Sequence, residues 1–202
     1  MMRMCVTVLV LLLTAVLPAG AEDLHDLFDA PCARYGVPKA LALAIARKES
    51  ALNPWIMNVE GRTVRAASRA DAMALSQAAL QSGLSFDIGV MQVNSQWLRR
   101  YNLPLEDVMD PRGNIQVGTW ILGQEIKRHG LTWRAVAAYH TPHTDSERGR
   151  TYAEDVIRRI SGRETPAVSG DRPPESSGPA LTRDKEAAAS PMLVKRYVVS
   201  ND

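Results

Sequence analysis

The 202 residues of this chain are enough for one compact domain with extensions, and their composition is that of an ordinary globular protein. The formal net charge is only +2, from 24 basic and 22 acidic side chains. This argues against a nucleic-acid-binding protein, which normally concentrates basic residues on one face. The charge says little about other anionic partners.

The first 21 residues have the layout of a secretory signal peptide. Arg3 supplies a positive charge, residues 6–17 are almost entirely apolar, and Pro18 and the segment 19–21 precede acidic residues. This apolar run is well short of the roughly 20 residues that span a bilayer. We therefore expect cleavage after Ala21, export to the periplasm, and no stable membrane anchor.

Removal of that segment leaves Cys32 as the only cysteine of the mature chain. One cysteine cannot form an internal disulfide, so we expect Cys32 to be a small buried side chain rather than a catalytic thiol. The stability of the fold must then come from packing alone.

Residues 22–161 have a mainly helical pattern, with short connections marked by glycine and proline. Gly36 suits the end of the first helix, Pro38 the first turn of the second, and Ser68 with Asp71 an S-x-x-D capping box for the third. Residues 84–94 lack a helical period and are expected to form a loop or a short extended segment. The expected helices cover residues 24–35, 38–50, 69–82, 95–101, 111–129, 132–140 and 147–160.

The composition changes after Ile160. Residues 162–202 are rich in Pro, Gly, Ser, Ala and charge, and their few large apolar side chains lie mainly within 192–199. Such a segment buries too little surface to offset its ordering entropy, so we expect a disordered tail. The sequence therefore predicts one mainly α domain over residues 22–161, with a short irregular or β segment.

Glu49, at the end of the second expected helix, is the first candidate for chemistry. Leu41, Ile45 and Glu49 are four residues apart and share one helix face, which indicates a partly buried carboxyl group. Burial and the negative end of the helix dipole both raise the pKa of such a group. A carboxylic acid protonated near neutral pH suits general-acid cleavage of a glycosidic bond. The alternative is a solvated carboxylate, or one paired with a cation such as Lys48.

Glu49 begins a series of five short motifs. They are Glu49-Ser50, Gly89-Val90-Met91-Gln92-Val93-Asn94, Asn114-Ile115 with Gly118, Ala138-Tyr139-His140, and Tyr152-Ala153 with Val156. In this order and spacing the chain resembles the lytic transglycosylase family over about residues 30–160. The resemblance implies a goose-type lysozyme-like fold. More narrowly, the chain is similar to small members that serve secretion, pilus and conjugation machines.

The resemblance implies a role for each matching position. Glu49 corresponds to the catalytic acid/base, and Tyr152 is a candidate to donate a hydrogen bond to it. The positions that correspond to substrate-binding residues are Ser50, Gly89, Met91, Gln92, Asn94, Tyr139, His140 and Tyr152. For the two tyrosines, core packing is the alternative.

The resemblance also implies non-hydrolytic cleavage of peptidoglycan by one carboxyl group. Glu49 would protonate the oxygen between N-acetylmuramic acid and N-acetylglucosamine, and would then deprotonate the muramoyl C6 hydroxyl as it attacks C1. The product is a 1,6-anhydro sugar, and no metal or organic cofactor is expected. The expected partners are glycan strands and components of an envelope-spanning secretion or conjugation machine.

Two segments depart from the family pattern. His140 stands where the family has asparagine, and it could add pH dependence, tune sugar binding or fill space. His140 and His143 have no evident third ligand, so a zinc site is not expected. Residues 58–86 are longer than in compact members, and the two interpretations are a flap over the groove and a partner-binding surface.

Asp87 leaves a choice between reaction types. A second carboxylate facing Glu49 could position a water molecule, which would make the protein a hydrolysing muramidase. We expect Asp87 to be a capping or loop residue instead. A glycan-binding assembly factor without catalytic activity is the third hypothesis.

Overall fold

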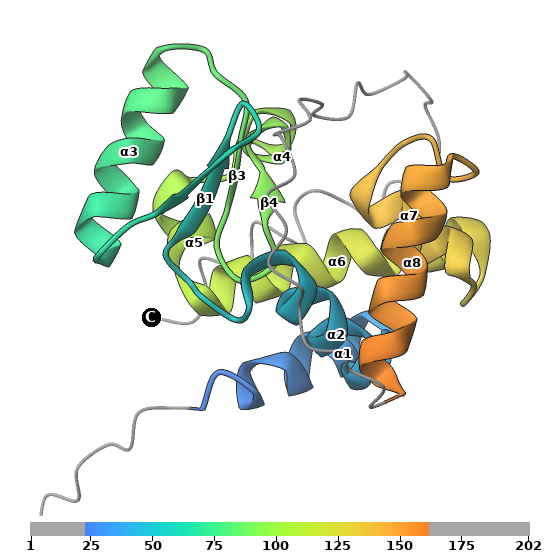
Figure 1. Ribbon diagram of the computed structural model, residues 1–202. Coiled ribbons are helices and arrows are strands. Elements are labelled where there is room, and N and C mark those ends of the chain that lie inside the picture. Colours follow the sequence, from blue (N-terminus) through green and yellow to red (C-terminus); the bar gives the residue numbers. More distant parts are fainter. Residues whose placement is uncertain (1–22, 162–202) are drawn as a thin grey trace, which may run out of the picture.

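The computed structural model describes residues 23–161 (Figure 1). The expected signal peptide, residues 1–21, and the expected tail, residues 162–202, lie outside the described residues. Within the described range the chain is mainly helical with one small antiparallel sheet, which confirms the expected fold class. No helix in this range is long and apolar enough to cross a membrane.

The helices agree closely with those expected from the sequence. The first expected helix is divided into a 3-10 turn and an α-helix, and the short α5 was not expected because five residues show no period. The helical elements are η1 (Asp26–Phe28), α1 (Asp29–Tyr35), α2 (Lys39–Ser50), α3 (Arg69–Gln81), α4 (Ser95–Tyr101), α5 (Leu105–Met109), α6 (Pro111–His129), α7 (Trp133–His140) and α8 (Glu147–Ile160).

The helix ends follow the expected local chemistry. Gly36 ends α1 in the left-handed region, at φ 67°. The Ser68 hydroxyl accepts a hydrogen bond from the backbone N–H of Asp71 at 3.1 Å, which caps α3. The Asp71 carboxylate accepts from the Ser68 hydroxyl at 2.8 Å. The capping interaction is therefore present at the predicted place.

Four short strands form a sheet in the order β2-β1-β3-β4, and all neighbouring pairs are antiparallel. The strands are β1 (Ile56–Val59), β2 (Arg62–Arg65), β3 (Phe86–Ile88) and β4 (Val93–Asn94). Strands β3 and β4 confirm the short extended segment expected within residues 84–94. The β1–β2 hairpin was not expected, because the side chains of β2 are mostly exposed and show no apolar alternation.

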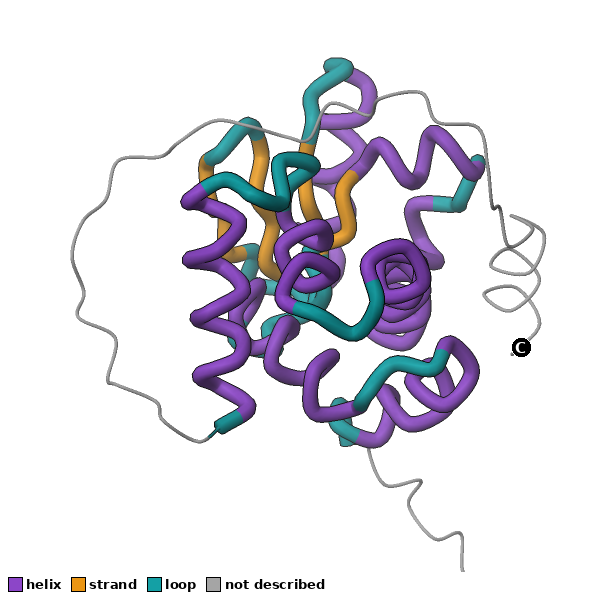
Figure 2. Tube along the Cα trace, turned by 90° about the vertical axis from the view of Figure 1, so that its right-hand side faces the viewer, coloured by secondary structure: helices purple, strands orange, loops and turns teal. Residues whose placement is uncertain are grey.

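Helix α6 runs through the middle of the molecule, and residues 113–123 of it are buried (Figure 1). It packs against α1, α5, α7 and β4. In the view turned by 90° the strands lie close together, and helices joined by loops make up the rest of the domain (Figure 2). Gly118 permits this close packing, since a Cβ atom there would lie 2.4 Å from Cβ of Met91.

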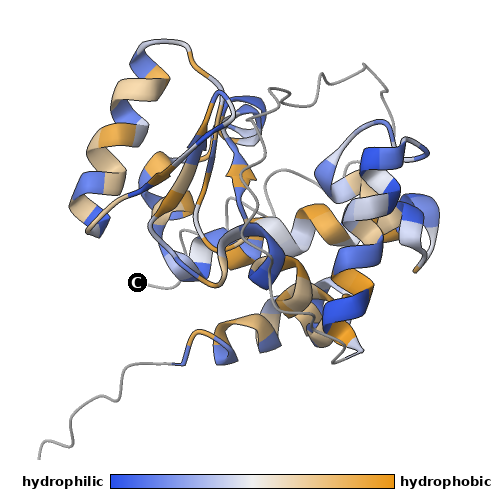
Figure 3. Cartoon of the chain, in the orientation of Figure 1, coloured by the Kyte–Doolittle hydropathy of each residue, from blue (hydrophilic) through white to orange (hydrophobic). Residues whose placement is uncertain are grey.

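Helix α8 is mainly hydrophilic (Figure 3) and buries a single stripe of side chains at helical spacing. The stripe consists of Gly149, Tyr152, Ala153 and Val156. It packs against α7 and against α2, the helix that carries Glu49. This packing brings Tyr152 to the end of α2.

Cys32 is buried in α1 and is the free cysteine of the described part of the chain. Burial raises the pKa of its thiol to about 11, so the thiol stays protonated and unreactive near neutral pH. The expectation of a small buried side chain is confirmed.

Candidate active site

A groove of about 350 Å³ lies between the sheet and the helical part of the domain. The end of α2, the β1–β2 hairpin, strands β3 and β4, and helices α4, α6, α7 and α8 all contribute side chains to it. Of the residues predicted from the sequence, five line this groove. They are Glu49, Gln92, Asn94, Tyr139 and His140.

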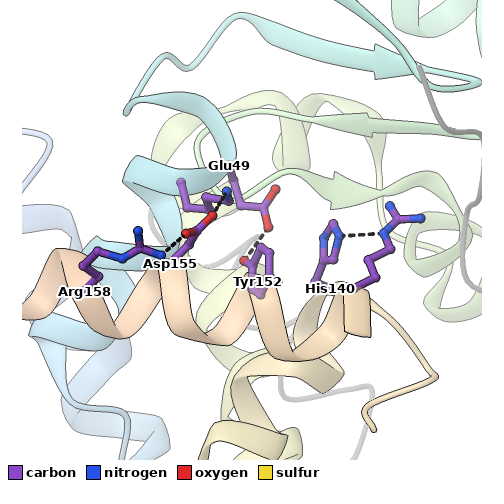
Figure 4. Close-up of polar contacts among 7 residues, drawn as sticks. Glu49, His140, Tyr152, Asp155 and Arg158 are labelled. Atoms are coloured by element: carbon purple, nitrogen blue, oxygen red, sulfur yellow. Dashed lines mark hydrogen bonds and ion pairs between the residues drawn. The ribbon is translucent and has the colours of Figure 1, made fainter. Parts of the chain in front are cut away.

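Glu49 is half-buried in the last turn of α2, as its spacing from Leu41 and Ile45 predicts. The Tyr152 hydroxyl of α8 donates a hydrogen bond of 2.5 Å to Glu49 Oε1 (Figure 4). Lys48 pairs instead with Asp155 on α8, with Nζ 2.6 Å from Oδ2. The alternative of a Glu49–Lys48 ion pair is therefore not what the structure contains.

Burial raises the pKa of Glu49 to about 7. The hydrogen bond from Tyr152 opposes this shift because it favours the ionised carboxylate, whereas the negative charge of Asp87 adds to the shift, and Lys48 lowers the pKa. At neutral pH both the acid and the carboxylate are then populated, which is the property that an alternating acid and base needs.

Four predicted residues lie behind the groove wall rather than on it. Ser50 is buried, with Oγ 2.8 Å from the Val90 carbonyl oxygen, and so joins the end of α2 to the loop before β4. Gly89 lies in that loop at φ 78°, and Met91 is fully buried beside Gly118. Together with Tyr152, these residues hold the groove-lining side chains in place.

Asn114 of α6 clamps the same loop, and the sequence pointed to it only as part of a motif. Its Oδ1 accepts from the Met91 N–H at 2.7 Å, and its Nδ2 donates to the carbonyl oxygens of Ile88 and Val108 at 2.9 and 3.0 Å. A Cβ atom at Gly89 would lie 2.4 Å from that Nδ2, so glycine is required there.

Gln92 and Tyr139 complete the loop's hydrogen bonds on the groove side. Gln92 has a positive φ of 46°, and its Nε2 donates to the carbonyl oxygens of Ile56 and Gly89 at 3.1 and 3.0 Å. The Tyr139 hydroxyl donates to the Met91 carbonyl at 2.7 Å. Both side chains are thereby held rigidly where they line the groove.

Asp87 lies in β3 and lines the groove, so the expectation of a capping or loop residue is wrong. Its neighbours Phe86 and Ile88 point into the core, and the alternation of a strand turns the Asp87 carboxylate the other way. Three residues are too few for this alternation to be recognised in the sequence. Burial raises the pKa of Asp87 to about 6, against a hydrogen bond of 2.7 Å from Asn94 Nδ2.

His140 stacks on the ring of Tyr152, with centroids 4.3 Å apart and planes 2° from parallel. Its Nε2 accepts a hydrogen bond of 3.2 Å from Arg148 Nε, so Nδ1 carries the proton of the neutral ring (Figure 4). Burial, with Arg148 and Lys48 nearby, lowers the pKa of His140 to about 4. The imidazole is therefore neutral near pH 7, and the described residues contain no cluster that could hold a metal ion.

Residues 26–158 match the family described as the transglycosylase SLT domain. The chain belongs to this family. This confirms the resemblance drawn from the five motifs and identifies the protein as a lytic transglycosylase.

Relatives with similar sequences cover different shares of this transglycosylase. Protein IpgF of Shigella sonnei is 30% identical over 141 residues, which are 66% of this chain and 78% of that protein. The X polypeptide of Escherichia coli is 39% identical over 82 residues, 37% of this chain and 48% of its own length. The type IV secretion system protein virB1 of Brucella abortus is 34% identical over 99 residues, 48% and 41% of the two chains.

The groove of this transglycosylase is also lined by residues that the sequence did not single out. Glu60, Gly61 and Thr63 come from the β1–β2 hairpin, Trp97 from α4 and Arg148 from α8. No local motif marks them, because each reaches the groove only through the packing of its element against others.

Residues 58–86, which the sequence marked as an extra segment, form helix α3 and most of the β1–β2 hairpin. The tip of the hairpin, Glu60 and Gly61, lines the groove. Helix α3 instead packs on α5, β1 and β3, on the side of the sheet away from α7 and α8 (Figure 1). The segment therefore contains two parts, and only the hairpin belongs to the groove.

Proposed function

We propose that this transglycosylase cleaves the β-1,4 bond between N-acetylmuramic acid and N-acetylglucosamine, with Glu49 as its single acid/base and a 1,6-anhydro sugar as product. The observation that supports this most directly is a half-buried carboxyl group, with a pKa of about 7, at the wall of a polar groove. Such a group both gives and accepts a proton near neutral pH.

The proposed reaction uses the two oxygens of Glu49 differently. Oε1 is engaged by Tyr152, so we assign proton transfer to Oε2. The protonated carboxyl gives its proton to the glycosidic oxygen as the C1–O bond breaks, and the substrate's N-acetyl group meets the positive charge at C1. The carboxylate then takes the proton of the C6 hydroxyl as O6 bonds to C1. Glu49 ends protonated, and no water is consumed.

Tyr152 and Asp87 would tune this carboxyl group in opposite directions. The Tyr152 hydroxyl stabilises the carboxylate, whereas an ionised Asp87 stabilises the protonated form and would also favour positive charge on the sugar. His140 supports Tyr152 by stacking on its ring. We propose substrate contacts for Gln92, Asn94, Tyr139 and His140, which line the groove.

Asp87 also favours a second candidate function, hydrolysis. Its carboxylate lies in the same groove as Glu49, where it could position a water molecule for attack on C1. The products separate the two reactions. Purified sacculi digested with the wild type should yield 1,6-anhydro ends by mass spectrometry, and reducing ends would establish hydrolysis instead.

Glu49→Gln, assayed side by side with the wild type, tests the catalytic role itself. Glutamine keeps the shape of the side chain but neither gives nor accepts the required proton, so cleavage should be lost. Cleavage at the wild-type rate would eliminate Glu49 as the acid/base. Retained glycan binding without cleavage by the wild type would support the glycan-binding assembly factor.

We propose that the enzyme acts in the periplasm and opens the wall locally for a secretion, pilus or conjugation apparatus. The N-terminal pattern of residues 1–21 supports export, and similarity to a type IV secretion system protein, virB1, supports the link to an apparatus. Cell fractionation should find mature protein beginning at Glu22 in the periplasm. Deleting residues 165–202 tests the tail as a partner contact, and unaffected apparatus assembly would remove that role.

A further inference from the structure

Trp97 is the tryptophan that lines the groove, and its ring contacts are with Tyr101, Trp120 and Arg100 rather than with the polar network around Glu49. It projects from the middle of α4 and is half-buried. The aliphatic side chains of the groove lining are Ile56, Val93 and Ile121. Most other lining residues are polar, among them Asn58, Asp87 and Gln96. The groove therefore has an aromatic surface set in polar surroundings.

Neighbouring rings hold Trp97 in one orientation. Tyr101, one turn further along α4, is stacked on it with centroids 5.7 Å apart and planes 4° from parallel. The buried Trp120 of α6 meets Trp97 edge-on at 5.7 Å and Tyr101 edge-on at 5.1 Å. A side chain already fixed in this way loses little conformational entropy when a ligand packs against it.

Arg100, which is exposed and does not itself line the groove, places a cation over the rings of the same cluster. Its guanidinium carbon lies 5.8 Å from the ring centroid of Trp97 and 5.6 Å from that of Tyr101. A guanidinium at this position adds hydrogen-bond donors next to an apolar plate. An apolar ring with polar donors close to it matches a sugar, which has C–H faces and a rim of hydroxyl groups.

We infer that Trp97 is a sugar-stacking residue, forming a binding subsite separate from the position where Glu49 cleaves. The C–H bonds on one face of a pyranose ring carry slight positive charge and pack on the negative face of an indole. The inference rests on the proposed function in that the ligand is a peptidoglycan glycan strand. Trp97 would give the protein a second binding contact with that strand, so long strands should bind more tightly than a disaccharide.

Binding to the Glu49→Gln form of the full mature chain tests this inference without cleavage. The probes are long peptide-free glycan strands from purified sacculi and the disaccharide of the two wall sugars. Adding Trp97→Ala should weaken binding of the long strands about tenfold and of the disaccharide by less than about twofold. Trp97→Phe, which keeps a flat ring, should retain most of the affinity for long strands.

Tryptophan fluorescence supplies a readout that a merely structural role would not move. Long strands should change the emission of the Glu49→Gln protein, and Trp97→Phe should abolish that change. Trp133→Phe is the matched control, because Trp133 is a half-buried tryptophan on α7 that does not line the groove. It should leave the change intact.

Two outcomes would overturn the inference. In the first, adding Trp97→Ala leaves the affinity for long strands within about twofold of that of the Glu49→Gln protein. In the second, the change in tryptophan emission persists when Trp97→Phe is added. Equal losses for the disaccharide and the long strands would place Trp97 at the cleavage position and would also overturn it. If strands bind through Trp97 but the wild type does not cleave them, the proposed function fails while the subsite stands.

Discussion

Replacing Glu49 by glutamine should abolish cleavage and, above pH 7, make the folded protein more stable. The pKa of Glu49 is about 7 in the folded protein and near 4.5 for an ordinary glutamate, chiefly because of burial. A group whose folded-state pKa is raised loses its proton more readily in the unfolded chain. The free energy of unfolding of the wild type therefore falls as the pH rises from about 4.5 to about 7.

The size of the effect follows from the two pKa values. A difference of about 2.5 pH units at 1.36 kcal/mol each corresponds to about 3 kcal/mol, and because Glu49 is only half-buried, solvent screening reduces it to about 2 kcal/mol. Glutamine does not ionise, and its carbonyl oxygen can still accept the hydrogen bond from Tyr152. Between acidic and alkaline pH, the free energy of unfolding of the variant should therefore rise by about 2–3 kcal/mol relative to that of the wild type.

Urea unfolding of the mature protein, followed by circular dichroism at several pH values from about 4 to 8, measures this difference. Glu154→Gln on α8 is the control, since its carboxylate is exposed and its loss should change stability by no more than about 0.5 kcal/mol. If the difference in free energy of unfolding between Glu49→Gln and the wild type stays constant with pH, the reasoning is refuted. So would a variant that becomes less stable than the wild type as the pH rises.

Three further substitutions test the surroundings of Glu49. Tyr152→Phe removes the donor to Oε1 and should raise the pKa of Glu49, moving the basic limb of the pH–rate profile for glycan cleavage upward by about one unit. Asp87→Asn removes a negative charge and should move the same limb downward; an upward movement would contradict the assigned electrostatics. Asn114→Ala leaves the Met91 N–H and two carbonyl groups without their partner and should lower the free energy of unfolding by about 3 kcal/mol. A loss below about 1 kcal/mol in urea unfolding would show that the clamp is dispensable.

The sequence alone determined the features that depend on near neighbours in the chain. Apolar spacing and capping residues located the helices, since each helix is stabilised by contacts three and four residues apart. The same spacing placed Glu49 at a half-buried helix end. The order of five motifs identified the family, because those residues stand at sites where loop geometry or the groove restricts the residue type.

Only the tertiary structure decided which distant side chains meet Glu49. Tyr152 is 103 residues away in the sequence, and although the family resemblance made it a candidate donor to Glu49, only the packing of α8 on the end of α2 shows the contact itself. Asp87 and the β1–β2 hairpin were missed for a related reason: strands of two to four residues are too short for a visible alternation, and pairing with other segments creates them. Trp97 likewise becomes a groove residue only when α4 packs beside the sheet. Long-range packing thus places the half-buried Glu49 in the wall of a polar groove, beside Tyr152 and Asp87.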